Sequence, residues 1–107
     1  MNDEGAVKIL SALAQPTRFK VFKLLIKLGA QGMPAGTIAN KLDVTQNTLS
    51  SHLNILVNAG VIDFVRDGRT LIYKIKFSNT QSFMDYLVTD CCNGQPELCS
   101  FISPKKM

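Results

Sequence analysis

The clearest pattern of hydrophobic and polar positions lies in residues 45–60, where leucines recur at helical spacing. These leucines are Leu49, Leu53 and Leu56. The opposite face is polar but uncharged, because it carries amide and hydroxyl side chains. Thr45 suits the N-cap of the helix, and Gly60 suits the left-handed position just past its end. The pattern therefore predicts a helix whose two ends are both marked.

Helical periodicity also predicts three helices before this stretch, at residues 6–14, 17–28 and 35–42. Pro16 ends the first of them and can open the next one at its first position. The first helix is carried by Ile9, Leu10 and Leu13. The second has a broad apolar stripe of Phe19, Phe22, Leu25 and Ile26, widened by Val21, Leu24 and Leu28, and we expect it to be the central core helix. Residues 29–34 hold two glycines and a proline and are predicted to form a turn.

Residues 61–77 are rich in β-formers and alternate between apolar and polar side chains. Asp67-Gly68 suits a two-residue hairpin turn, because such turns need positive φ. Arg66 and Arg69 would flank this turn, where they can reach phosphate oxygens or a minor groove. A surface hairpin with incidental arginines is the alternative. Two short helices joined by a tight turn, followed by such a hairpin, predict a winged helix-turn-helix, a mainly α (α+β) fold with a two-stranded β-hairpin wing.

Asn79 or Thr80 is predicted to cap the start of a last helix that runs to about Asp90. Its apolar side chains are Phe83, Tyr86 and Leu87, with Met84 and Val88 beside them. This stripe could complete the core of one subunit, but terminal helices of this kind also commonly build a two-fold interface. We therefore expect a homodimer through the terminal helices. The tail from residue 93 shows no period and is expected to be a loop followed by a mobile end.

The outer face of the helix at residues 45–60 can donate to and accept from base edges in a major groove. The alternative is an ordinary solvent-exposed helix, but such a face usually carries Lys and Glu. The helix-turn and the hairpin on either side of this stretch also favour DNA binding over that alternative. The candidate DNA contacts are Gln46, Asn47, Thr48, Ser50, Ser51, His52 and Asn54 on the helix, and Arg66 and Arg69 on the wing. As a lone imidazole, His52 is expected to contact backbone, phosphate or a neighbouring side chain, not to bind metal or to catalyse.

Composition adds limits to this interpretation. With 107 residues, 46% of them hydrophobic, the chain fits one domain with a modest core. A net charge of +4 favours a polyanionic partner such as nucleic acid without requiring one. No stretch approaches the roughly 20 apolar residues of a membrane span, so we expect a cytoplasmic protein without membrane contact. Three cysteines, an odd number, argue against a structural disulfide framework there.

Several runs of residues carry a family resemblance. They are Leu13-Ala14-Gln15-Pro16-Thr17-Arg18, Leu49-Ser50-Ser51-His52-Leu53 with Ala59-Gly60, Arg66-Asp67-Gly68-Arg69, and Tyr73. Their order and spacing closely resemble the ArsR/SmtB family of small winged-helix repressors. The resemblance implies a homodimeric repressor that leaves its operator DNA when it binds a metal or metalloid. Two family sites are missing, because residues 36–44 hold no thiol and the last helix holds no histidine.

The remaining candidate site, formed by the three cysteines near the C-terminus, resembles the cysteine sites of arsenic-responsive family members. Cys91, Cys92 and Cys99 make a soft, all-sulfur site. Trivalent arsenic, As(III), or antimony, Sb(III), fits it because each takes three sulfur ligands, whereas structural zinc needs a fourth ligand. Asp90 or Glu97 could supply that ligand, so another soft metal stays open, as do a redox switch and incidental cysteines. The adjacent pair could also bind organic trivalent arsenicals.

The sequence does not predict an enzyme or an intrinsic cofactor. A thiol enzyme would be expected to show Cys-x-x-Cys spacing and a βαβ pattern, which are not evident here. A winged helix used only for protein contacts is a further alternative. We expect residues 1–92 to form the DNA-binding and dimerisation domain, and residues 93–107 to form the cysteine-containing loop and flexible tail. The predicted function is a repressor released from its operator by As(III) or Sb(III), with thiol-based redox sensing or sensing of another soft metal as the alternative.

Overall fold

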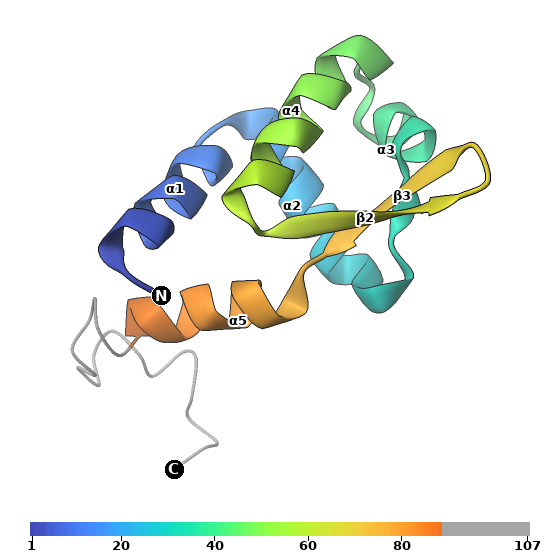
Figure 1. The fold of residues 1–107 in the computed structure, drawn as a ribbon. Helices are drawn as coiled ribbons and strands as arrows, with labels where there is room; N and C mark the ends of the chain where they lie inside the picture. The colour runs from blue at the N-terminus through green and yellow to red at the C-terminus, as the bar shows by residue number, and fades with distance from the viewer. Residues whose placement is uncertain (89–107) are drawn as a thin grey trace.

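The computed structural model describes residues 1–88, which form five α-helices and a three-stranded antiparallel sheet (Figure 1). In chain order the elements are α1 (Asp3–Leu13), α2 (Pro16–Leu28), the 3-10 helix η1 (Gly29–Gln31), β1 (Met33–Pro34), α3 (Ala35–Leu42), α4 (Gln46–Ala59), β2 (Ile62–Asp67), β3 (Thr70–Ile75) and α5 (Phe77–Tyr86). The mainly α winged helix-turn-helix predicted from the sequence is confirmed. None of the helices within residues 1–88 is both long enough and apolar enough to cross a membrane.

Local sequence signals set the helix ends. Pro16 occupies the first turn of α2, and the side chain of Gln15 accepts the Arg18 amide at 2.9 Å. The Thr45 hydroxyl accepts the Thr48 amide at 3.3 Å at the start of α4. Gly60 ends α4 in the left-handed conformation at φ 89°. The predicted caps of α4 and the helix-opening proline of α2 are thus confirmed.

The core lies between α1, α2 and α4, with α3 and the sheet closing its sides. Its largest fully buried side chains are Ile9, Leu25, Ile38, Leu49, Leu53, Leu56, Ile62, Val21 and Val61. Burying each leucine of α4 stabilises the fold by roughly 1.5–3 kcal/mol, which fixes how α4 is rotated about its axis.

The predicted apolar stripes of α1 and α2 were partly wrong. Phe19 and Ile26 are each 46% exposed, whereas Val21, which was expected only to widen the stripe, is fully buried. Leu10 on α1 is also 46% exposed. Apolar side chains surround much of α2, so periodicity alone could not decide which of its sides packs against α1 and α4.

The segment predicted as a turn at residues 29–34 also contributes a strand. β1 pairs with β3 through Met33 opposite Tyr73, which makes the sheet order β1-β3-β2. Gly32 permits this approach, because a Cβ at its position would lie 2.5 Å from the Tyr73 carbonyl oxygen. A two-residue strand is too short to show alternation in the sequence, so only the pairing with β3 defines it.

The hairpin turn is displaced by one residue from the prediction. Asp67 pairs with Thr70, so the two loop residues are Gly68 and Arg69 instead of Asp67 and Gly68. Gly68 has a φ of 68°, and within residues 1–88 Arg69 is not among the residues with positive φ. Such a pattern, with Gly at the first loop position, is typical of a type II′ turn. Arg69 therefore lies in the turn itself, while Arg66 belongs to β2 and pairs with Leu71.

The predicted start of the last helix was also wrong, because α5 begins at Phe77 with Lys76 as its N-cap. The two expected caps instead bond to the α4–β2 connection. Asn79 Nδ2 donates to the Gly60 carbonyl at 2.7 Å, and the Thr80 hydroxyl donates to the Val61 carbonyl at 3.3 Å. The side chains of Asn79 and Thr80 thus bond to distant carbonyls instead of capping the helix as the sequence had predicted. Residues 87 and 88 continue the predicted helix in π-helical form after Tyr86, and residues 89 and 90 of the prediction lie outside the described residues.

Candidate nucleic-acid interface

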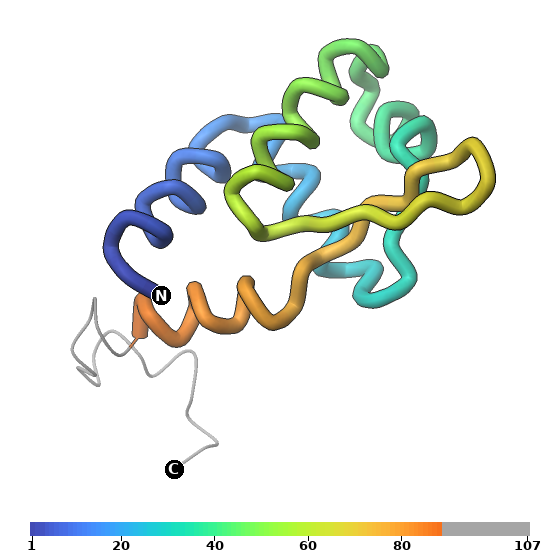
Figure 2. The backbone as a smooth tube through the Cα atoms, viewed as in Figure 1, coloured from blue at the N-terminus to red at the C-terminus, as the bar shows by residue number. Residues whose placement is uncertain are grey.

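Helices α3 and α4 form the helix-turn-helix, and the tube in Figure 2 shows the tight turn between them. Asp43 takes the left-handed conformation at φ 57°, and the Val44 amide donates to the Ala39 carbonyl at 3.1 Å. The chain then enters α4 at once through its Thr45 cap. The two helices are therefore held by a turn of three residues, 43–45, with a defined backbone path.

The outer face of α4 is built as the sequence predicted. Leu49, Leu53 and Leu56 are each no more than 1% exposed. The side chains that turn outward are Gln46, Asn47, Thr48, Ser50, Ser51 and Asn54, all of them exposed. Residues 44–62 contain no acidic side chain that would repel phosphates. This face can read base edges, and the role of each residue toward DNA stays a prediction.

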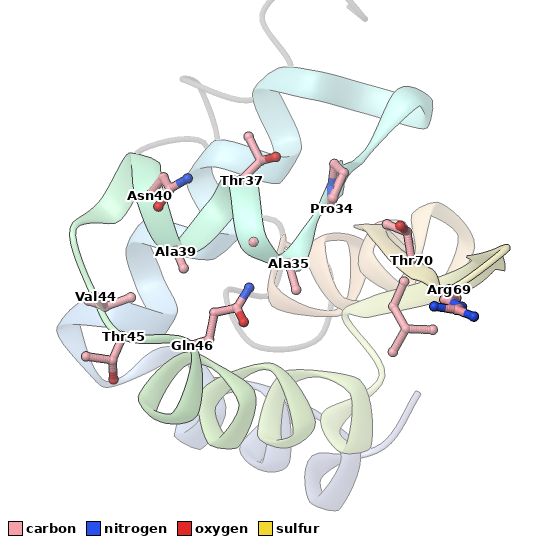
Figure 3. A pocket seen from close by; sticks show the side chains of 12 residues that line it. Pro34, Ala35, Thr37, Ala39, Asn40, Val44, Thr45, Gln46, Arg69 and Thr70 are labelled. Carbon is pink, nitrogen blue, oxygen red and sulfur yellow. The ribbon is translucent and has the colours of Figure 1, made fainter.

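Gln46 departs from the rest of this face. It lies beside a hollow of about 770 Å³ between α3, the start of α4 and the wing. Figure 3 shows its side chain pointing into the hollow toward α3, with Arg69 and Thr70 on the wing side. A Cβ on Gly36 would lie 2.9 Å from Gln46 Nε2, so the glycine leaves room for this amide.

The hollow is suited to a negatively charged group. Pro34 and Thr45, the N-caps of α3 and α4, both line it, so the partial positive charge at two helix N-termini faces the same space. Arg69 adds a full positive charge at the wing side, and Gln46 adds an amide donor. A DNA phosphate lying between the helix-turn-helix and the wing would find donors on both sides.

The wing is the hairpin of β2 and β3, which projects beyond α3 in Figure 1. Arg66 and Arg69 are both exposed on it. Midway along the hairpin the rings of Phe64 and Tyr73 pack with centroids 5.5 Å apart, which stabilises the pairing of the two strands. The structure thus brings Arg69 of the wing close to the start of α4, since Arg69 and Gln46 line one hollow, whereas Arg66 does not line it.

His52 differs from the other candidate residues because it is half-buried on the flank of α4 and has a protein partner. Its Nδ1 lies 3.2 Å from Nη1 of Arg18. Burial lowers the pKa of His52 below its ordinary value, and the positive charge of Arg18 lowers this pKa further. Contact with a neighbouring side chain was one of the roles expected for this histidine. Arg18 was not predicted as a site residue, although it closes one of the motif runs quoted above.

No group of three His, Cys, Asp or Glu side chains within residues 1–88 is placed to hold a metal ion. The predicted ligands Cys91, Cys92 and Cys99 lie outside these residues. The arsenic site therefore stays a prediction.

A helix-turn-helix that packs on the core by its apolar side, a second helix with an exposed polar face, and an arginine-bearing hairpin beside it define a winged helix-turn-helix DNA-binding protein. The class is supported by a match of residues 13–64 to a family described as a helix-turn-helix domain. The chain belongs to the family of helix-turn-helix transcriptional regulators that includes the repressor SdpR, as the first of the following likenesses shows.

The transcriptional repressor SdpR of Bacillus subtilis is 32% identical over 90 residues, which cover 84% of this chain and 97% of SdpR. An ArsR-like regulator from Rhodococcus sp. RHA1 shares the fold with a TM-score of 0.72 at 20% identity, covering 95% of this chain and 93% of that one. The homodimeric winged-helix domain Mb0332 from Mycobacterium bovis has a TM-score of 0.64 at 23% identity, covering 84% of this chain and 87% of that one.

Proposed function

We propose that the protein is a homodimeric repressor that binds operator DNA and is released by trivalent arsenic or antimony bound at Cys91, Cys92 and Cys99. The observation that carries DNA binding is the uncharged polar face of α4, held outward by three buried leucines and beginning beside Arg69 of the wing. Repression is supported by the likeness to SdpR, which is itself named as a repressor.

Two features support the dimer. Helices α1 and α5 contact each other, and both expose large apolar side chains. Val7 on α1 is 61% exposed, and Phe77 and Met84 on α5 are 54% and 41% exposed. A second copy would remove these side chains from water, and the similar fold of Mb0332 is homodimeric.

In the sequence the proposed inducer site lies shortly after α5, because Cys91 comes five residues after the end of this helix at Tyr86. Helix α5 is in turn bonded through Asn79 to the carbonyl of Gly60, the residue that ends α4. A ligand that binds more tightly when α5 is displaced would thus also disturb the recognition helix. Release needs this difference in affinity, since equal binding to both states shifts nothing.

The test is a titration of the fully reduced protein with arsenite. DNA fragments selected by the protein from a random library report binding by fluorescence anisotropy, and a thiol reagent counts free cysteines at each step. We expect DNA release to parallel the loss of three thiols per subunit. Release by peroxide or a disulfide, with no response to arsenite, would instead establish the redox alternative. Binding that does not weaken with salt, or no DNA binding at all, would contradict the repressor.

A further inference from the structure

Arg18 joins three helices at one point. Its side chain leaves the first turn of α2, and its Nε donates to the carbonyl of Ala12 near the C-terminal end of α1. Nη1 of the same guanidinium lies 3.2 Å from Nδ1 of His52 on α4. The last carbonyls of a helix have no partner within the helix, so a cation that bonds to one of them is well placed. Arg18 thereby connects the α1–α2 corner to the middle of the recognition helix.

The chemistry of this contact fixes the protonation of His52. A guanidinium carries only N–H donors and does not lose its proton in proteins. Nδ1 of His52 must therefore accept, which leaves the ring neutral with its proton on Nε2. Burial and the charge of Arg18 both lower the pKa of His52, which agrees with a neutral ring.

The second ring nitrogen reaches the surface. Within residues 1–88 no fully buried side-chain nitrogen or oxygen lacks a hydrogen-bond partner, and the bond of His52 to Arg18 uses Nδ1. Nε2 is therefore accessible to solvent on the flank of α4. The neighbours of His52 one helical turn away are Thr48 and Ile55, and both are exposed. Thr48 lies in the first turn of α4, beside the outer face described above.

We propose that Arg18 is a positioning residue for DNA binding, which orients His52 so that its Nε2–H donates to a phosphate oxygen of the DNA backbone beside α4. A donor held in one tautomer and one orientation loses less conformational freedom on binding than a free imidazole. A neutral donor of this kind fixes the position of the recognition helix on the duplex without reading bases. The inference rests on the DNA binding of the proposed function and is independent of the inducer.

The first test is the tautomer of His52 in the full-length protein. His52 is the only histidine in the chain, so ¹⁵N-imidazole NMR reports it without overlap. We expect a protonated Nε2 and an unprotonated Nδ1 in the wild type, and a mixture of tautomers in Arg18→Met. A wild-type ring protonated at Nδ1 overturns the inference. This measurement needs no DNA, so it stands even if the proposed function fails.

The second test separates positioning from charge. Lys20→Met removes one positive charge from an exposed position on the same helix and serves as the matched control. We expect Arg18→Met to weaken DNA binding roughly tenfold more than Lys20→Met does, which is the size of one hydrogen bond to a charged group. Thermal unfolding of both variants checks that the fold is kept. Equal losses in the two variants contradict the role of Arg18.

A double-mutant cycle then asks whether Arg18 acts through His52. His52→Gln keeps an N–H donor that needs no tautomer, so Arg18→Met should cost little in that background. The same loss in both backgrounds would mean that Arg18 acts on the DNA or the fold directly, which overturns the inference. If Arg18→Met does not fold, His52→Gln and His52→Phe still test whether the side chain at position 52 donates a hydrogen bond to the DNA. Binding near the wild-type level for Gln and about tenfold weaker for Phe is expected, and equal binding of the two contradicts the donor.

Discussion

Asn47 and Gln46 are neighbours at the start of α4, yet they face different surroundings. Asn47 is exposed on the outer face, whereas Gln46 points into the hollow beside α3 (Figure 3). Recognition helices of this fold generally meet base edges with their N-terminal residues, so we expect Asn47 to be the better placed of the two to contact a base. The structure thus separates two residues that the sequence treated alike.

Asn47→Ala should therefore cost about 1–3 kcal/mol of binding free energy and relax the preference at one operator position. Binding to a set of single-base variants of a selected site measures both effects. Asn58→Ala, at an exposed position near the other end of the same helix, is the control and should leave the preference unchanged. Unaltered selectivity after Asn47→Ala would exclude this residue as a reader.

His52 also makes the stability of the fold depend on pH. Its pKa in the folded protein lies below the value of 6.5 for the free side chain, so the unfolded chain binds the proton more readily. The contribution of His52 is fully present above pH 6.5 and is lost as the pH falls toward its folded pKa. Urea unfolding of the wild type and of His52→Gln across this range should show a steeper loss of stability in the wild type. Parallel curves would mean that the pKa shift is absent.

At the scale of elements, β1 exists because Gly32 lets the chain approach β3. Gly32→Ala combines a positive φ with a Cβ 2.5 Å from the Tyr73 carbonyl oxygen. We expect it to destabilise the fold by roughly 1–3 kcal/mol. Gly29→Ala has a similar φ of 66° but nothing within 4 Å of the new Cβ, so it isolates the cost of the backbone conformation. Chemical denaturation should place Gly32→Ala clearly below Gly29→Ala, and equal stabilities would contradict the close approach.

The wing should act through charge. Arg69 lies in the hairpin turn and lines the hollow at the start of α4, where a phosphate contact is independent of sequence. Arg69→Ala should weaken binding to all DNA about equally and reduce the slope of log K against log salt by about 1. Lys27→Ala, at an exposed position in the last turn of α2, is the control for net charge. A loss confined to the operator would instead indicate base reading by Arg69.

For the whole molecule, DNA binding and induction should be separable. Cys99 lies beyond the last predicted helix and outside the apolar stripes predicted for the core, so Cys99→Ser should leave folding and DNA binding nearly intact. Only the response to arsenite should weaken, because a serine hydroxyl poorly replaces a soft thiolate. Anisotropy titrations of wild type and variant with arsenite, and with an organic arsenical that needs fewer sulfurs, measure this. DNA release at the wild-type arsenite concentration would exclude a three-sulfur site, and loss of DNA binding without arsenite would make the cysteine structural.

The sequence by itself determined the features that depend on near neighbours. The caps Thr45 and Gly60, the helix-opening Pro16 and the buried leucines of α4 follow from interactions within about one helical turn, so local pattern suffices for them. The exposed polar face of α4 follows as well, since it is the side opposite the leucines. These features define the helix-turn-helix and most of the candidate DNA contacts.

Only the tertiary structure decided which groups meet across the chain. Arg18 and His52 are 34 positions apart, and Asn79 bonds to Gly60 from 19 positions away, so no local period reveals either contact. The exposure of Phe19 and Ile26 was equally hidden, because an apolar residue is buried only where another element covers it. Three outcomes depended on tertiary packing: which side of α2 is buried, the hydrogen bond of Asn79 to a distant carbonyl, and the orientation of Gln46 toward α3. Each of them depends on the surface that the rest of the fold supplies.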